Sequence, residues 1–457
     1  MIIVEKPGQP REIVPTIFCN KESESKVVFA SIVSVTISGA ESIEQQVQMI
    51  VVLLIITLFV ALISRPLRLP YTLVLVVVGL LIGLFPILPQ VYFNPNAVLF
   101  LFLPALLFEG AWNIEVKLLL ADWLPVLLLA VPGLLLSVFI VAALVHWGIG
   151  LSWLLALLLG SMVAPTDPIA VLSLLRKMGL SERLRVIVEG ESLFNDGVGA
   201  AVFTIVLAFL LPPLGLAVPG NTGFWAIAAD ALWLMLGGLA IGLVVGWLVA
   251  HLLRFVDDFL IEMTITFCVA YGVYLLGITL HTSGLLAVVA AGLVMGSYGR
   301  SKGMSQRTQE ATQDIWEFIG YLANSLLFLL LGVQIGASRY TQAIPGVIWA
   351  LVGVVAGRVL MIYLFLPLQD AIARRAMRKA RPFPNTWRPL LVFSGLRGAL
   401  SIALVLSLPA ALAQRDLLAG IVYGVVLVTL LGQGLGLFVL LPRWQKEAGK
   451  EDSSSTP

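Results

Sequence analysis

Runs of apolar residues, separated by short polar loops, recur along this chain from about residue 48 onward. Each run is close to the ~20 residues that an α-helix rising ~1.5 Å per residue needs to cross a hydrocarbon core of ~30 Å. The pattern therefore predicts about thirteen membrane-spanning helices. They cover approximately residues 48–64, 71–88, 95–113, 124–145, 153–175, 186–211, 224–253, 259–278, 282–298, 316–336, 343–366, 388–411 and 417–441.

The composition agrees with an all-α integral membrane protein. Hydrophobic residues make up 59% of the chain and charged residues 12%, whereas soluble domains carry roughly 25% charged residues. The net charge of +2 does not indicate a nucleic-acid partner, because the charges are segregated into loops. Two distant cysteines and three scattered histidines lack the spacing of a disulfide framework or metal centre, so no cofactor is expected.

Basic residues in the loops predict the orientation in the membrane. With the N-terminus outside, the cytoplasmic segments hold twenty lysines and arginines, whereas the external connections between spans hold two. This asymmetry follows the positive-inside rule and supports an odd number of spans. We therefore expect an external N-terminus and a cytoplasmic C-terminus, with the protein in the cell (inner) membrane.

The two ends of the chain differ from the region between them. Residues 1–46 are polar, and their apolar run Val27–Ile37 is too short to span a bilayer. We interpret them as a mobile tail or as an extension upstream of the true start, and a long signal peptide is a weaker alternative. Residues 47–442 form the predicted transmembrane domain, and residues 443–457 a short cytoplasmic tail.

Thirteen spans divide into two groups of six around one connecting helix, which is the arrangement of an inverted-topology repeat. Such folds carry interrupted helices at matching positions of the two halves. The fifth span contains Pro165–Pro168 (PTDP), and the twelfth contains Gly395–Gly398 (GLRG). Proline removes a backbone donor and paired glycines loosen the backbone, so both spans are expected to break and to cross. Ordinary kinks in packed helices are the alternative interpretation.

The sixth span contains EGESLFNDGVGAA, residues 189–201, which is unusually polar for a membrane helix. Intramembrane ionisable groups cost about 2.5–3.5 kcal/mol each on insertion scales, so they usually face a cavity and act there. Ser192 and Asp196 are four residues apart and share one helix face, and Glu191 and Asn195 form the neighbouring stripe. The face offers hard oxygen ligands to a monovalent cation or a proton.

A carboxylate such as Asp196 can hold either a proton or a cation. Burial favours the protonated form, whereas a bound cation favours the ionised form. Competition between them would give exchange across the membrane. A static buried network of polar groups is the alternative interpretation.

Other charged residues in the spans need partners. Arg358 in the eleventh span is expected to pair with Glu191. Arg397 in the second break can meet the negative end of a half-helix or a carboxylate such as Asp167. Glu109 in the third span is either a helix-end residue or an oxygen that supports the site. The remaining acidic residues near span ends are expected to be solvated or interfacial: Glu189, Asp257, Asp258 and Glu262.

Three motifs together resemble those of sodium/proton exchangers of the cation/proton antiporter superfamily, in the bacterial NhaP-like branch. They are APTDP at 164–168, EGESLFNDG at 189–197 and SGLRGAL at 394–400, and the resemblance covers about Met49–Leu441. It implies the thirteen-helix inverted-repeat fold, a homodimer, elevator-like movement of a core bundle against a dimerisation bundle, and a role in pH homeostasis.

Carried onto this sequence, the resemblance implies that Asp196 binds the cation and the proton, with Asn195 beside it in an asparagine–aspartate pair. The asparagine–aspartate form, together with Arg358, implies electroneutral exchange of one Na⁺ for one H⁺. The other matched positions are Ser192, Thr166 and Asp167 as coordinating or supporting residues, Glu191 with Arg358 as a buried ion pair, and Glu109 as an acidic site position.

The resulting prediction is a secondary Na⁺/H⁺ (Li⁺/H⁺) antiporter in which Asp196, Ser192 and Thr166 contact the transported Na⁺. A K⁺/H⁺ antiporter of the same fold is the alternative, because oxygen ligands do not separate Na⁺ from K⁺. A cation channel would need a continuous pore with repeated rings of ligands. An enzyme is not expected, because no nucleophile–base pair or zinc spacing occurs in the sequence.

Overall fold

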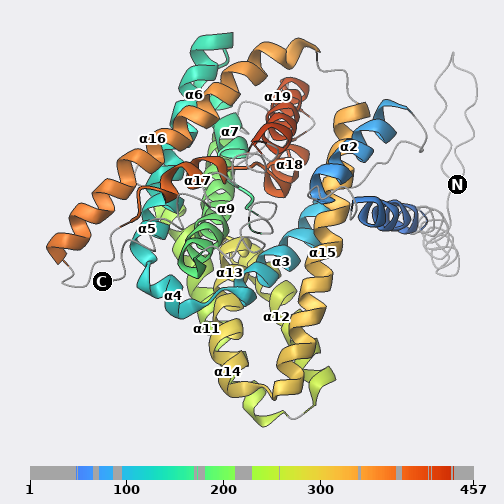
Figure 1. Ribbon diagram of the computed structural model, residues 1–457, viewed down its shortest axis with the longest axis vertical. Helices are drawn as coiled ribbons and strands as arrows, with labels where there is room; N and C mark the ends of the chain where they lie inside the picture. Colours follow the sequence, from blue (N-terminus) through green and yellow to red (C-terminus); the bar gives the residue numbers. More distant parts are fainter. Residues whose placement is uncertain are drawn as a thin grey trace, which may run out of the picture. The chain divides into compact units, whose positions relative to one another are not determined.

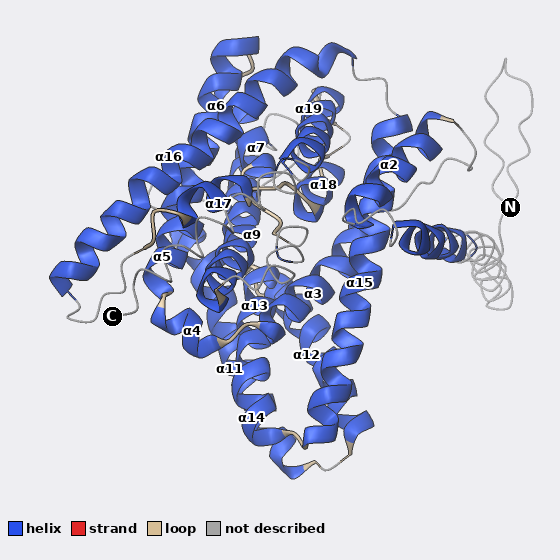
Figure 2. Ribbon diagram, in the orientation of Figure 1, coloured by secondary structure: helices blue, strands red, loops and turns tan. Residues whose placement is uncertain are grey.

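A computed structural model describes residues 48, 50–64, 71–85, 95–168, 172, 181–210, 229–256, 258–337, 341–376, 383–409, 411–412, 414–433 and 436. Every regular element in this described part is a helix (Figure 2), which confirms the all-α prediction. The chain divides into two compact units, Met1–Ile55 and Ile56–Pro457, and helices α2 to α19 belong to the second. The predicted tails, residues 1–46 and 443–457, lie outside the described residues.

The α-helices of the second unit follow the predicted spans in order. They are α2 (Tyr71–Leu84), α3 (Pro95–Asn113), α4 (Val116–Ala121), α5 (Trp123–Leu128), α6 (Leu134–Ile149), α7 (Trp153–Val163), α9 (Glu182–Leu210), α11 (Gly238–Leu252), α12 (Phe259–Thr279), α13 (Gly284–Val294), α14 (Arg300–Gly303), α15 (Gln306–Ala337), α16 (Ile344–Ala376), α17 (Trp387–Phe393), α18 (Ala399–Leu406) and α19 (Arg415–Val428).

Seven helices of the described part are long and apolar enough to cross a membrane. Five shorter apolar helices, from Ile50–Ser64 to Gly284–Gly299, occupy other predicted spans. The twelfth predicted span, 388–411, is divided between α17 and α18. The chain is thus a multi-pass membrane protein, whereas the count of thirteen crossings stays a prediction.

Helix ends follow local signals in the sequence. Ser152 and Ser283 cap α7 and α13 by accepting hydrogen bonds from backbone N–H groups of the first turn. Asp258 does the same for α12, which agrees with its predicted interfacial position. Gly150 ends α6 in the left-handed conformation, with φ of 71°, where glycine carries no steric cost.

Three helices extend beyond the apolar runs that predicted them. α9 begins at Glu182 instead of residue 186, α15 begins at Gln306 instead of 316, and α16 continues to Ala376 instead of ending at 366. The apolar pattern locates only the part of a helix that lies in hydrocarbon, whereas backbone hydrogen bonding continues through polar residues beyond it.

Both predicted helix breaks are confirmed. α7 ends at Val163 where Pro165 follows, because the proline cannot donate to a preceding carbonyl. The twelfth span is interrupted between α17 and α18, over residues 394–398, which carry no regular helix. Polar backbone groups are therefore released from helical pairing at two places in the membrane domain.

The long helix α9 lies at the centre of the site region and contacts α3, α7, α13 and α18 (Figure 1). On another side, α15 runs along α2 and α3. Glycines allow the contact between α15 and α2: a Cβ added to Gly79 would lie 2.2 Å from the Leu329 carbonyl, and one added to Gly332 would lie 2.2 Å from the Val76 carbonyl. Small residues thus bring these two backbones together.

Candidate functional site

The two interrupted segments meet each other. The backbone N–H of Asp167 donates to the Leu396 carbonyl at 2.8 Å. A Cβ added to Gly398 would lie 2.0 Å from Asp167 Oδ2, so only glycine leaves room for this carboxylate. The breaks predicted from PTDP and GLRG are therefore one structural feature, in which each segment satisfies part of the other's freed backbone.

Arg397, in the second break, contacts the first break with its side chain. Its side chain is 1% exposed, and Nη1 donates to the Pro165 carbonyl at 3.3 Å. Pro165 follows the last turn of α7, so the guanidinium lies at the negative end of that half-helix. Of the two partners predicted for Arg397, the structure therefore shows the half-helix end.

Side chains of helix α9 form hydrogen bonds with Thr166 in the first break. Ser192 Oγ donates to the Thr166 carbonyl at 2.5 Å, and Asn195 Nδ2 donates to Thr166 Oγ1 at 2.8 Å. The Thr166 N–H points at Asn195 Oδ1, 3.4 Å away. Gly199 permits this approach, since a Cβ there would lie 2.4 Å from Pro165 Cγ. The structure thus brings Ser192 and Asn195 of α9 together with Thr166 of the first break.

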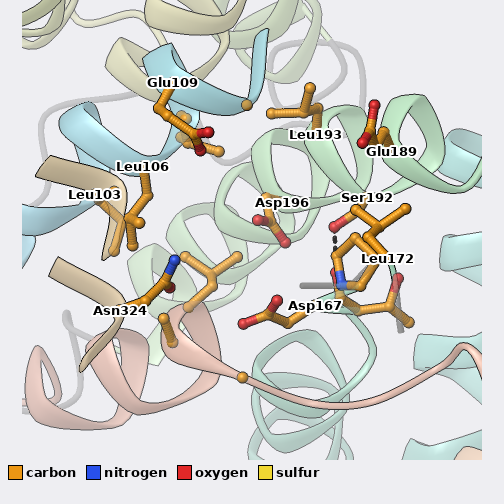
Figure 3. A pocket seen from close by; sticks show the side chains of 18 of the residues that line it. Leu103, Leu106, Glu109, Asp167, Leu172, Glu189, Ser192, Leu193, Asp196 and Asn324 are labelled. Atoms are coloured by element: carbon orange, nitrogen blue, oxygen red, sulfur yellow. Dashed lines mark hydrogen bonds between the residues drawn. The ribbon is translucent and has the colours of Figure 1, made fainter. Parts of the chain in front are cut away.

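Asp196 lies one turn beyond Ser192, and its carboxylate points into a cavity of about 320 Å³ (Figure 3). Asp167 and Ser192 line the same cavity, with Asp196 and Asp167 both directed into it. The cavity extends from the meeting point of the breaks toward Glu109 in α3. Asn113 Nδ2 donates to Glu109 Oε1 at 2.8 Å. Glu109 thus lines the cavity and also lies in the last turns of α3, so both of its predicted interpretations stay open.

The charge of the cavity wall has a single sign. Its described lining contains five acidic residues and no lysine, arginine or histidine. They are Glu109, Asp167, Glu189, Asp196 and Glu317. A cavity lined by one sign of charge between apolar walls raises the local concentration of the opposite ion. The site is therefore built to attract cations.

The predicted ion pair between Glu191 and Arg358 is confirmed. Arg358 Nη1 contacts Glu191 Oε1, and Nη2 donates to Glu191 Oε2 at 3.0 Å, with both residues almost fully buried. Arg358 also donates from Nε to the Leu391 carbonyl at 2.9 Å and from Nη2 to Ser394 Oγ at 3.2 Å. One arginine thus ties α9 and α16 to the helix that enters the second break.

One prediction about an acidic residue is wrong. Glu189 was expected to be solvated, but it is 7% exposed and lines the cavity. The reason is that α9 begins at Glu182, seven residues before Glu189, so Glu189 lies inside the helix. Arg185 on the preceding turn lies 3.4 Å from Glu189 Oε1 as a counter-charge. Glu262 lies in the first turn of α12, as its predicted place at the start of that span requires, and it is 1% exposed. Asp257 lies outside the described residues.

The polar cavity residues that were not predicted include Glu317 and Asn324 in α15, and Ser401 in α18. Asn324 follows the same rule that identified Asp196, because it is a polar residue inside an apolar span. It carries no charge and stands in no motif, so the rule alone does not distinguish it from a packing residue.

Comparisons with known proteins agree with this geometry. The family profile described as sodium/hydrogen exchanger, transmembrane, matches residues 50–443. The Na(+)/H(+) antiporter ApNhaP of Aphanothece halophytica is 35% identical over 355 residues, which covers 77% of this chain and 66% of that protein. The Na(+)/H(+) antiporter NhaP of Pseudomonas aeruginosa is 34% identical over 349 residues, covering 75% of this chain and 80% of that protein.

A solved structure shows the same fold. The sodium proton antiporter MjNhaP1 of Methanocaldococcus jannaschii superposes with a TM-score of 0.68, over 87% of this chain and 97% of that one. At 19% sequence identity this likeness speaks for the fold alone. The alignment spans 66% of the length of ApNhaP, just under two thirds, and the rest of that relative is not matched by this chain.

Proposed function

This chain belongs to the transmembrane sodium/hydrogen exchanger family, and we propose that it exchanges a monovalent cation, Na⁺ or Li⁺, for a proton at Asp196. The observation that carries the proposal is the acidic cavity that ends at Asp196 and at the meeting point of the two broken segments. The relatives from Aphanothece halophytica and Pseudomonas aeruginosa are named Na(+)/H(+) antiporters, which supports the same activity here.

Exchange follows from two occupants competing for one carboxylate. In a cavity that removes it from bulk water, the Asp196 carboxylate is stabilised either by a proton or by a cation. Asp167 across the same cavity adds negative charge that a cation relieves. Loading a cation on one side therefore expels the proton, and loading a proton on the other side expels the cation.

The residues around Asp196 divide the remaining work. Ser192 Oγ and Thr166 Oγ1 are hydroxyl oxygens with lone pairs left for a cation, because each can accept as well as donate. Asn195 holds Thr166 by its amide, so its role is to position that residue. Asp196, Ser192 and Thr166 are the proposed ligands of Na⁺, with Asp167 and Glu109 as further acidic groups of the cavity.

A one-for-one, electroneutral exchange is supported by the charges nearest to Asp196. Its neighbour Asn195 has no proton to exchange, and Glu191 is neutralised by Arg358. With neither group taking part, we propose that Asp196 alone exchanges one cation for one proton, and that Asp167 and Glu109 keep their charges.

The proposed architecture retains thirteen crossings, in two inverted groups of six helices, within a transmembrane domain of residues 47–442. An external N-terminus and cytoplasmic C-terminus place the end of α3 and the starts of α9 and α15 on the cytoplasmic side. Glu109, Glu189 and Glu317 lie toward those ends, so the cavity opens to the cytoplasm in this state. A homodimer in the inner membrane, acting in pH homeostasis, completes the proposal.

The wild-type protein in proteoliposomes should show proton flux when Na⁺ or Li⁺ is added, followed with a pH-sensitive dye. Electroneutral exchange moves no net charge, so an imposed membrane potential should change the initial rate by less than about twofold. If one net charge crossed the membrane in each cycle, a potential of 100 mV would change the driving energy by about 2.3 kcal/mol. Vesicles that carry a proton ionophore serve as the control for leak.

Other outcomes of this experiment separate the alternatives. Flux with K⁺ but not Na⁺ would make the protein a K⁺/H⁺ antiporter. Cation flux that needs no counter-movement of protons would indicate a channel and would contradict the proposed exchange. A rate that follows the imposed voltage would contradict electroneutrality.

A further inference from the structure

Two buried polar side chains of the cavity have no hydrogen-bond partner within the described part of the chain. Asn324 is 5% exposed and its Oδ1 accepts from no donor there. Ser401 is 1% exposed and its Oγ is likewise without a partner in that part. Both residues line the cavity that contains Asp196. The other neutral polar residues around Asp196 are engaged, as the contacts of Ser192 and Thr166 show.

An unpartnered amide oxygen in a buried wall is costly and therefore informative. Burying a polar group without a hydrogen bond is unfavourable, and buried groups without a partner call for a ligand or another explanation. An amide oxygen accepts only, so its partner must be a donor or a cation. In a cavity whose charged residues are all acidic, a cation is the partner that the surroundings favour.

The two residues approach the cavity from different helices. Asn324 belongs to α15, which packs along α2 and α3, and Ser401 lies in the first turn of α18, just beyond the second break. Helices α15 and α18 contact each other. In Figure 3, Asn324 lies on the opposite side of the cavity from Ser192, with Asp196 and Asp167 between them. Oxygens thus face the aspartates from both sides.

We propose that Asn324 Oδ1 and Ser401 Oγ are neutral oxygen ligands for the cation in the cavity beside Asp196, and that they determine which monovalent cation is accepted. This inference rests on the proposed exchange at Asp196. A cation that sheds its hydration water needs several oxygens at once, and the number and field strength of those oxygens separate one alkali ion from another. Asn324 and Ser401 supply such oxygens without adding charge.

Neutral ligands leave a signature that the acidic residues do not. Amide and hydroxyl groups contact a cation but bind no proton in the physiological range, whereas Asp196 binds both. Removing Asn324 or Ser401 should therefore weaken the cation side of the exchange and leave its dependence on proton concentration unchanged. A residue that only packs the cavity wall would alter the maximal rate or the stability without changing the preference among cations.

The test uses Asn324→Leu, which keeps the approximate volume, and Ser401→Ala in the full chain. Proton flux in proteoliposomes is measured against the concentrations of Na⁺, Li⁺ and K⁺. Losing one contact to an ion should raise the KM for Na⁺ about tenfold, by analogy with hydrogen bonds to charged groups, and should shift the Na⁺/Li⁺ ratio. Asn324→Asp retains an oxygen at this position and should retain Na⁺ binding.

Ser161→Ala is the matched control, because Ser161 in α7 is fully buried, donates to the Leu158 carbonyl of its own helix at 2.7 Å and does not line the cavity. Its KM for each cation should match that of wild type. Values within about twofold of wild type in both Asn324→Leu and Ser401→Ala would overturn the inference. If Asn324→Leu fails to fold, as judged by gel filtration in detergent, Ser401→Ala and Asn324→Asp decide.

Failure of this inference is distinguishable from failure of the proposed function. An active wild type, inactive Asp196→Asn and unchanged KM values in the Asn324 and Ser401 variants would remove only these two ligands. Absence of cation-driven proton flux in wild type would remove the exchange itself.

Discussion

Asp196→Asn is expected to abolish cation-driven proton flux, lowering the rate by at least about 100-fold. An amide has nearly the shape of the carboxylate, but it neither binds a proton nor carries the charge that stabilises a bound cation. Because Asp196 points into the acidic cavity, the substitution removes the group for which we propose that the two ions compete. The measurement is proton flux in proteoliposomes on addition of Na⁺ or Li⁺.

Asp314→Asn is the matched control for this substitution. Asp314 is an exposed acidic residue of α15 that does not line the cavity, so the same chemical change there should leave the rate within about twofold of wild type. The monodispersity of both variants in detergent shows that each is folded. Exchange that survives in Asp196→Asn would assign the exchanged proton to another residue.

The second large effect is expected on stability, at the ion pair between Glu191 and Arg358. Replacing Glu191 by Gln leaves a buried guanidinium without its counter-charge, which should cost about 3–5 kcal/mol of stability. Arg358→Met should cost a similar amount, because it leaves the Glu191 carboxylate buried and also removes the donors to Leu391 and Ser394. Thermal unfolding of the purified protein in detergent is the measurement.

The double variant separates pairing from simple packing. Glu191→Gln combined with Arg358→Met should lose clearly less stability than the two single losses added, because neither charge is then left alone. Glu182→Gln is the matched control, because Glu182 pairs with Arg185 while its own side chain is 51% exposed. Exposed pairs contribute about 0–1 kcal/mol, so this variant should lose little stability. Strictly additive losses at Glu191 and Arg358 would show that the pair does not act as a unit.

The sequence predicted the site where a charge or a helix breaker stood out from its surroundings. Ser192 and Asp196 were placed on one face by helical spacing, and Glu191 and Arg358 were matched because neither charge is stable alone in hydrocarbon. The proline pair and the glycine pair located both breaks. That these breaks bond each other, through Asp167 and Leu396, depends on how distant helices pack.

Residues whose role depends on packing were missed or misplaced. Asn324 and Ser401 are neutral and common, and only the approach of α15 and α18 to the cavity distinguishes them. Glu189 was assigned to solvent from its distance along the helix, but its burial depends on neighbours that the order of residues does not reveal. Charged site residues inside a membrane span can thus be predicted from the sequence, whereas the neutral residues that line a cavity cannot.

The arrangement of fixed charges around Asp196 supports the proposed competition of two kinds of ion for one site. Arg358 neutralises Glu191 and Arg397 lies at the end of α7, so both buried arginines are occupied within the scaffold. The acidic residues of the cavity wall remain turned toward the incoming cation. Neither arginine is among the described residues that line the cavity: Arg358 has the counter-charge of Glu191, and Arg397 donates to a backbone carbonyl.

Competition between cation and proton at Asp196 is the central claim, and the KM for Na⁺ measured as a function of pH tests it most directly. In proteoliposomes with wild-type protein, lowering the pH in the range where protons occupy the site should raise the KM about tenfold per pH unit, while the maximal rate at saturating Na⁺ is unchanged, because one bound proton must leave for each cation that enters. A KM for Na⁺ that stays constant while the rate falls with pH would contradict a single shared carboxylate.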